Sequence, residues 1–149
     1  EMILAMAAST LLVMLTVLIH YEALRLVSDL LPDLRIPPRS KILFVIFGSF
    51  LAHTLEVWLY ALGLYLLGTD TTVGELKGQL SGGFSEYLYF STVTYTSLGL
   101  GDVWPEGALR LVTGVESLNG LVLIGWTASY TYLTMREFWD LHPKRRRRH

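Results

Sequence analysis

Three long apolar segments alternate with shorter polar ones along the chain, and this pattern predicts helices that cross a membrane. The first, residues 2–19, contains 18 residues without a formal charge and as a helix would span about 27 Å. That length approaches the roughly 30 Å hydrocarbon core of a bilayer. Residues 42–67 and 108–133 are longer still, and each contains only two charged or histidine side chains. We therefore predict three transmembrane helices.

Two polar segments separate these spans. Residues 29–40, DLLPDLRIPPRS, are rich in proline and charge, so they cannot continue a helix and predict an ordered turn. Residues 68–85, GTDTTVGELKGQLSGGFS, follow the second span and predict a polar, glycine-rich loop. Ser85 closes this loop as the expected N-cap of the next helix.

The segment 86–96, EYLYFSTVTYT, mixes bulky and hydroxyl side chains without strict alternation. Its residues favour a strand by propensity, but an open strand in lipid would leave backbone groups unpaired, so a helix is favoured. Eleven helical residues cover only about 17 Å. The segment can therefore enter the membrane without crossing it. The chain is expected to turn at 97–102 and leave on the side it entered, which makes a re-entrant loop.

Composition supports a membrane protein, and the distribution of charge predicts how its spans are oriented. Of the 149 residues 52% are hydrophobic and 17% are charged, which is typical of a membrane protein rather than a soluble domain. Ten of the twelve lysines and arginines lie between the first two spans or after the third, and only Lys77 and Arg110 lie elsewhere. Because basic residues gather on the cytoplasmic side, the N-terminus is predicted outside and the C-terminus inside. A cleaved signal peptide is the less favoured interpretation of the first span, because no basic region precedes it.

The stretch 97–102, SLGLGD, places two glycines one residue apart at the turn of the predicted re-entrant loop. Irregular backbone at membrane depth survives only where protein buries it or where it lines a wet cavity. Glycines can adopt positive φ, which allows successive carbonyls to point to one side, and such oxygens can replace the water shell of a cation. The negative end of the preceding helix would favour a cation there too. A packing turn is the alternative, but the context favours a pore.

The segment 94–102, TYTSLGLGD, resembles the pore signature of the potassium channel pore-domain family, in its form with one pore loop per chain, here with an extra N-terminal span. The resemblance implies that the potassium ion binds at the carbonyls of a selectivity filter. By position the filter residues are Ser97, Leu98, Gly99, Leu100 and Gly101. The residues at its mouth and in its support are Asp102, Tyr89, Phe90 and Thr96.

Three positions depart from the commonest family pattern. Ser97 stands where threonine is usual, and Leu100 stands where an aromatic residue is usual. Val93 occupies a position where some bacterial channels have a glutamate that pairs with the outer aspartate. The resemblance therefore implies that Asp102 needs another partner, either Tyr89 or Trp104.

In the third span, the resemblance places Gly120 at the hinge of the inner helix, beside Asn119, and Tyr132 near the cytoplasmic constriction. A gate hinge is one interpretation of Gly120. The other is close helix packing, for which glycine is frequent in membrane helices. The sequence leaves both interpretations open.

Ionisable side chains inside the predicted spans are costly and need a partner. His53 and Glu56 lie at i and i+3 on one helix face. A proton sensor or part of a metal site is one interpretation, and a hydrogen-bonded pair that locks the helix to a neighbour is the favoured one, because no third ligand has a matching spacing. Glu116 raises the same choice, with a bond to Thr92 or Thr94 as its expected structural role.

The chain divides into an N-terminal transmembrane helix at 1–28, a cytoplasmic hinge at 29–40, a pore domain at 41–137 and a basic cytoplasmic tail at 138–149. The fold class is an all-α membrane protein with three transmembrane helices, a re-entrant pore helix and a selectivity filter. One filter segment per chain requires a ring of four chains, so a homotetramer is expected.

The function expected from this arrangement is passive, potassium-selective conduction in a plasma or inner membrane, with no catalysed reaction, no cofactor beyond the permeant potassium ion and no nucleic-acid partner. The bilayer itself is the other partner, and the tail KRRRR at 144–148 suits anionic lipid. The alternatives are a poorly selective cation channel, a non-conducting channel-like subunit and, less favoured, a membrane metalloprotein that uses His53 and Glu56.

Overall fold

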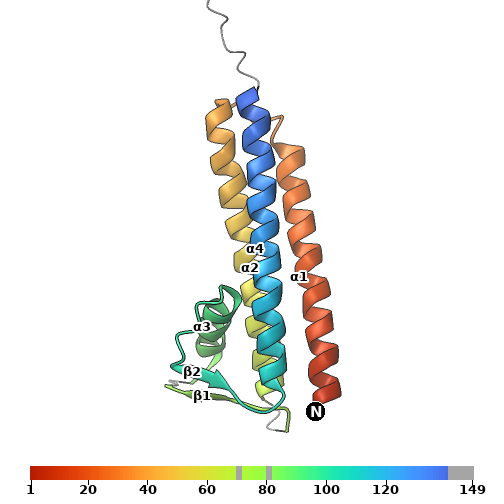
Figure 1. Ribbon diagram of the computed structural model, residues 1–149, viewed down its shortest axis with the longest axis vertical. Helices are drawn as coiled ribbons and strands as arrows, with labels where there is room; N and C mark the ends of the chain where they lie inside the picture. Colours follow the sequence, from red (N-terminus) through yellow and green to blue (C-terminus); the bar gives the residue numbers. More distant parts are fainter. Residues whose placement is uncertain (70–71, 80–81, 141–149) are drawn as a thin grey trace, which may run out of the picture.

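The structure is a computed structural model that describes residues 1–69, 72–79 and 82–140. Three long helices lie side by side, and a short helix with two short strands lies at one end of the bundle (Figure 1). In chain order, the elements are α1 (Met2–Leu30), α2 (Pro38–Gly68), β1 (Leu76–Gly78), α3 (Phe84–Tyr95), β2 (Val103–Pro105) and α4 (Leu109–Asp140).

The three long helices correspond to the three predicted spans, and each is long and apolar enough to cross a membrane. α1 packs against both α2 and α4. The helices extend further than the apolar runs, so the polar turn between α1 and α2 is only 31–37 rather than 29–40. α2 begins at Pro38 because proline, which has no N–H, costs little in the first turn of a helix.

α3 is the helix predicted between the second and third spans, but its expected N-cap was wrong. The helix begins at Phe84, one residue before Ser85, and Gly83 precedes it with a φ of 104°. No side chain among the described residues caps the helix, and Glu86 of the first turn instead accepts a hydrogen bond of 2.6 Å from the Gly82 N–H of the preceding loop.

The strands β1 and β2 were not predicted. They pair antiparallel with Lys77 opposite Trp104, so part of the loop at 68–85 and the segment after Asp102 form a small ribbon. Strands of three residues are too short for an alternation of apolar and polar residues to show. Figure 1 shows that the chain after α3 returns to the end of the bundle where this ribbon lies, which is also the end where α1 begins.

The core lies between the long helices and α3. Tyr60, Leu64, Leu109, Val112 and Leu123 are all fully buried there. In contrast, large apolar side chains such as Phe47 and Phe50, each more than 70% exposed, cover the outside of α2. An apolar exterior of this kind suits lipid or another protein chain.

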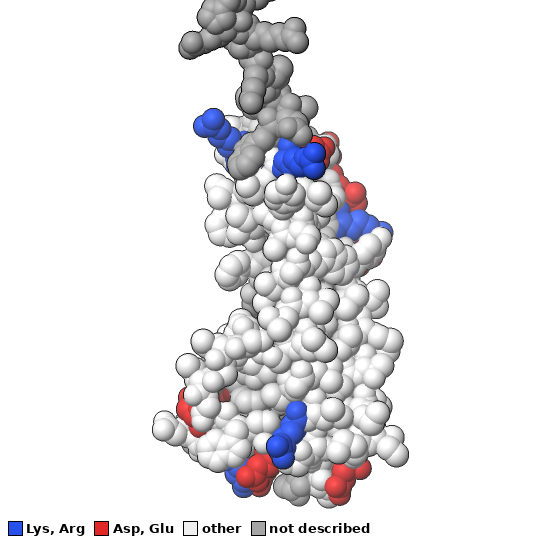
Figure 2. All heavy atoms as spheres, in the orientation of Figure 1, with Lys and Arg blue, Asp and Glu red and all other residues white. Residues whose placement is uncertain are grey.

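On the face seen in Figure 2, charged side chains gather at the two ends and uncharged ones cover the middle. At the β1–β2 end, the hydrogen bond from Lys77 to the Glu75 carboxylate raises the pKa of the Lys77 ammonium. The uncharged belt between two charged ends has the distribution expected of a molecule embedded in a bilayer.

Candidate functional site

The segment after α3 alternates in backbone handedness. Ser97, Gly99 and Gly101 have φ values of 59°, 57° and 80°, so every second residue from 97 to 101 is left-handed. Two of these residues are glycines, for which this conformation costs little, whereas it is uncommon for a serine. An alternation in the sign of φ allows successive carbonyls to point to the same side.

The start of this segment is tied to α3. The N–H groups of Leu98 and Gly99 both donate to the Val93 carbonyl, at 3.0 and 3.2 Å. The Ser97 hydroxyl oxygen lies 2.9 Å from that of Ser117 on α4. The turn is thus fixed to the C-terminal end of α3 and to the long helix that follows it.

The end of the segment is held by Asp102. The Tyr89 hydroxyl donates to Asp102 Oδ2 over 2.7 Å, and Asp102 Oδ1 accepts the Val103 N–H over 3.1 Å. Of the two partners that the sequence left open, Tyr89 makes this contact, whereas Trp104 belongs to the β1–β2 ribbon and lies opposite Lys77. The segment is therefore anchored at both ends within the single chain.

Between these anchors the segment is uncovered. Leu98 and Leu100 are 63% and 59% exposed, and a side chain added at Gly99 or Gly101 would meet no atom within 4 Å. Of the two other residues expected to support the segment, Phe90 is buried, whereas Thr96 is exposed and bonds back to the Thr92 carbonyl.

Gly120 lies within the unbroken helix α4 and packs against α3. A side chain at Gly120 would collide with the Tyr95 carbonyl. This close contact supports the close-packing interpretation. The neighbouring Asn119 side chain donates to Thr16 on α1 over 2.7 Å and to Tyr60 on α2 over 3.1 Å. The hinge at Gly120 and the constriction at Tyr132 stay predictions.

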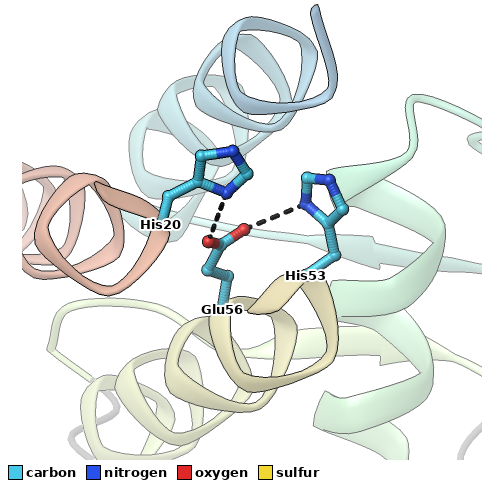
Figure 3. Close-up of side chains that lie close together, drawn as sticks. All are labelled: His20, His53 and Glu56. Atoms are coloured by element: carbon cyan, nitrogen blue, oxygen red, sulfur yellow. Dashed lines mark hydrogen bonds and ion pairs between the residues drawn. The ribbon is translucent and has the colours of Figure 1, made fainter. Parts of the chain in front are cut away.

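A cluster of buried polar side chains joins α1 to α2. His20 Nδ1 lies 2.9 Å from Glu56 Oε1, and His53 Nδ1 lies 3.0 Å from Glu56 Oε2 (Figure 3). His20 and Glu56 are fully buried, and the His53 side chain is 19% exposed. The sequence singled out His53 and Glu56, but it did not identify His20 as their third member.

Two more side chains complete this cluster. The Tyr95 hydroxyl of α3 donates to Glu56 Oε2 over 2.5 Å. Thr127 Oγ1 of α4 lies 2.9 Å from His53 Nε2 and 3.2 Å from His20 Nε2. All four helices therefore meet at this one group of polar atoms.

Glu116, also fully buried, forms a second link between α4 and α3. Its expected partner, Thr92 or Thr94, was wrong: the Ser91 hydroxyl donates to Glu116 Oε1 over 2.5 Å. Thr92 instead bonds to the Leu88 carbonyl of its own helix. Ser91 lies one residue before Thr92, on the face of α3 that meets α4.

A cavity of about 540 Å³ lies between α2, α3 and α4, beside the cluster. His53, Tyr95 and Thr127 contribute to its wall, which is otherwise mostly apolar. The cavity gives the buried polar atoms a route to the outside of the single chain.

Three helices of membrane length, with a short helix and an anchored loop inserted before the last of them, define a helical membrane protein of channel architecture. The model of the ion channel family matches residues 41–137, from the start of α2 to near the end of α4. The chain therefore belongs to the ion channel family. This is a family of channels and not of enzymes. No curated protein and no solved structure matches the chain.

Proposed function

We propose that the protein is a passive, potassium-selective channel whose filter is formed by the carbonyls of 97–101. The observation that carries this proposal is the left-handed backbone at Ser97, Gly99 and Gly101, in a loop tied to protein at both ends. A loop held in this way would present its backbone oxygens in a fixed array. Fixed carbonyls can replace the hydration shell of a permeating ion.

The direction of α3 supports a cation as the ion. The C-terminal end of this helix, at Tyr95, is followed directly by the loop. A helix carries partial negative charge at its C-terminus, and Asp102 adds a carboxylate at the far end of the loop. The backbone between them therefore lies in a field that attracts cations. Potassium in particular comes from the resemblance of 94–102 to the potassium channel signature.

The assembly we propose is a homotetramer in a plasma or inner membrane, with the N-terminus outside. One loop per chain makes only one wall of an ion pathway, and closed rotational symmetry supplies the others. The exposure of Leu98 and Leu100 supports such an assembly, because large apolar side chains in a loop favour contact with other chains. The basic tail at 144–148 lies outside the described residues, and its binding of anionic lipid stays a prediction.

Two departures from the family pattern bear on selectivity. Ser97 retains a hydroxyl at the innermost filter position, but this hydroxyl lies 2.9 Å from Ser117 Oγ. Leu100 has no hydroxyl with which to hold the filter to α3. A filter held less tightly would discriminate less between potassium and sodium, so a poorly selective cation channel is the nearest rival.

Flux through liposomes that contain the purified protein tests these alternatives. We expect potassium to leave loaded vesicles quickly and sodium to leave slowly, from a preparation with four chains per particle. Equal rates for the two ions would establish the poorly selective channel instead. Absence of flux for both would support a non-conducting subunit.

Replacement of Gly99 by alanine tests the position of the filter most directly. A left-handed conformation costs a non-glycine residue about 1–2 kcal/mol, and a tetramer would bear this strain four times around one pathway. We expect G99A to abolish potassium flux. G114A is the matched control, because Gly114 is helical and an added side chain would meet no atom within 4 Å. Full flux through G99A would place the ion pathway elsewhere.

A further inference from the structure

The cluster of His20, His53 and Glu56 has the composition of a transition-metal site. Two imidazole nitrogens and a carboxylate oxygen, one from each residue, lie within 4.8 Å of one another. These side chains supply three ligands, and a water or the second carboxylate oxygen can complete the four-coordination that is usual for zinc. Histidine and carboxylate ligands together suit Zn²⁺ and its neighbours better than they suit Ca²⁺ or Mg²⁺.

Two of the distances between donor atoms are close to those of a tetrahedral site. Zinc bonds of about 2.0–2.1 Å at a tetrahedral angle separate neighbouring ligand atoms by roughly 3.3 Å. The two nitrogen–oxygen distances to Glu56 are 2.9 Å for His20 Nδ1 and 3.0 Å for His53 Nδ1. The three ligand atoms lie within 4.8 Å of one another, so an ion between them requires side-chain shifts of up to about 1.5 Å to reach the tetrahedral separation.

The hydrogen bonds around the two rings are also compatible with a bound metal ion. If each neutral ring donates its Nδ1–H to Glu56, both Nε2 atoms are bare, and Thr127 has one hydroxyl proton for the two of them. With a metal ion on both Nδ1 atoms, each Nε2 carries the ring proton instead. Thr127 Oγ1 then accepts from both rings, as outer partners of zinc-bound histidines do.

The side chains around Glu56 also favour a bound cation. Tyr95 of α3 and Trp126 and Thr127 of α4 contact the cluster, and these three side chains are uncharged. A buried carboxylate needs a counter-charge. The Tyr95 hydroxyl can remain on Glu56 Oε2 as an outer hydrogen bond while the carboxylate binds an ion.

An ion also has a route to the cluster. The His53 ring forms part of the wall of the cavity between α2, α3 and α4, and its side chain is 19% exposed. His20 and Glu56 lie behind it and are fully buried. A metal ion that arrives through this cavity meets His53 first and is then enclosed by the other two ligands.

We propose that His20, His53 and Glu56 bind one Zn²⁺-class divalent ion per chain and that this ion fastens α1 to the pore domain. The site joins a helix outside the family match, α1, to α2 inside it. Through Tyr95 it also reaches the end of α3, two residues before Ser97. The proposal does not depend on which ion the channel conducts, because metal binding can be measured without flux.

The test is metal binding by the purified full chain in detergent. His142 and His149 are replaced by glutamine first, so that His20 and His53 are the remaining histidines. We expect this protein to bind one Zn²⁺ per chain and to give, with Co²⁺, the intense visible absorption of a four-coordinate site. H20Q should weaken Zn²⁺ binding by about 100-fold or more, since loss of an outer partner alone costs about 10- to 100-fold. T127V, which removes only an outer partner, should weaken Zn²⁺ binding by about 10- to 100-fold.

A measurement on the same background protein covers the case in which H20Q fails to fold. Zn²⁺ should raise the midpoint of thermal unfolding of the H142Q/H149Q protein, because a ligand that binds only the folded state stabilises it. Mg²⁺ at equal concentration is the control and should have no comparable effect. An unchanged midpoint with Zn²⁺, or H20Q that binds Zn²⁺ as tightly as its parent, would overturn the proposal.

Discussion

Gly120 shows how one missing side chain sets the packing of α4 against α3. Its Cα faces the Tyr95 carbonyl so closely that a Cβ would collide with it. Tyr95 in turn donates to Glu56 and lies two residues before Ser97, the first residue of the filter segment. The contact at Gly120 therefore couples α4 to the base of the loop. This coupling does not depend on whether α4 also bends at Gly120.

Replacement of Gly120 by alanine should destabilise the protein by about 1–3 kcal/mol, the range observed when a side chain is forced into a filled space. G125A is the control in the same helix, because an added side chain there meets no atom within 4 Å. Alanine also gains about 0.5–1 kcal/mol over glycine within a helix. The midpoint of thermal unfolding in detergent measures both effects. If G120A lowers it no further than G125A, the contact with Tyr95 does not limit the packing.

The residues of the loop were predictable from the sequence because their signal is local. Gly99 and Gly101, the flanking Ser97 and the closing Asp102 all lie within six positions of one another. His20 could not be identified in this way, because it lies 36 residues from Glu56 and on another helix. Spacing along one helix cannot show a ligand that only tertiary packing supplies.

At the scale of elements, α1 has an unusual distribution of polar residues. Its buried face includes Ser9, Thr16 and His20, whereas large apolar residues such as Ile3, which is 83% exposed, lie outside. In a soluble helix the apolar stripe marks the buried face, but in lipid the exterior is apolar and polar groups turn inward. The length of the apolar run therefore predicted the helix but not the face that packs.

The contact between Asn119 of α4 and Thr16 of α1 offers a test of how α1 is held. Thr16→Val removes the acceptor for the 2.7 Å bond from the Asn119 side chain while it preserves the volume. We expect a loss of about 0.6 kcal/mol and at most about 1.7 kcal/mol, the range of hydrogen bonds between membrane helices. Reversible unfolding in mixed micelles would measure it.

A double-mutant cycle separates this bond from the other effects of each substitution. Asn119→Ala should cost more than Thr16→Val, because Asn119 also donates to Tyr60. In the N119A background, Thr16→Val should cost almost nothing. Additive losses would show that the bond does not link the two helices.

At the scale of the whole molecule, the three spans were predictable because length and apolar content alone decide whether a helix can cross a bilayer. The β1–β2 ribbon was not, because its pairing joins residues on opposite sides of α3. The same limit applies to the meeting of four helices at Glu56. The sequence thus predicts each element better than it predicts the contacts between elements.

The distribution of charge predicts the orientation of the protein in the membrane, which the structure of a single chain does not determine. The β1–β2 ribbon and the start of α1 share one end of the bundle (Figure 1). Lys77 lies in that ribbon, whereas Arg39 belongs to the first turn of α2 beside the 31–37 turn. If basic residues remain cytoplasmic, the ribbon faces outward and the turn faces the cytoplasm.

Because the chain has no cysteine, single cysteines introduced at these two positions report the orientation without background. In intact cells a membrane-impermeant maleimide should label K77C and leave R39C unlabelled. After permeabilisation both should react. In the sequence, ten of the twelve basic residues lie between the first two spans or after the third, so the positive-inside rule assigns all ten the same side. Labelling of R39C alone in intact cells would invert the orientation and place the mouth of the loop, at Asp102, in the cytoplasm.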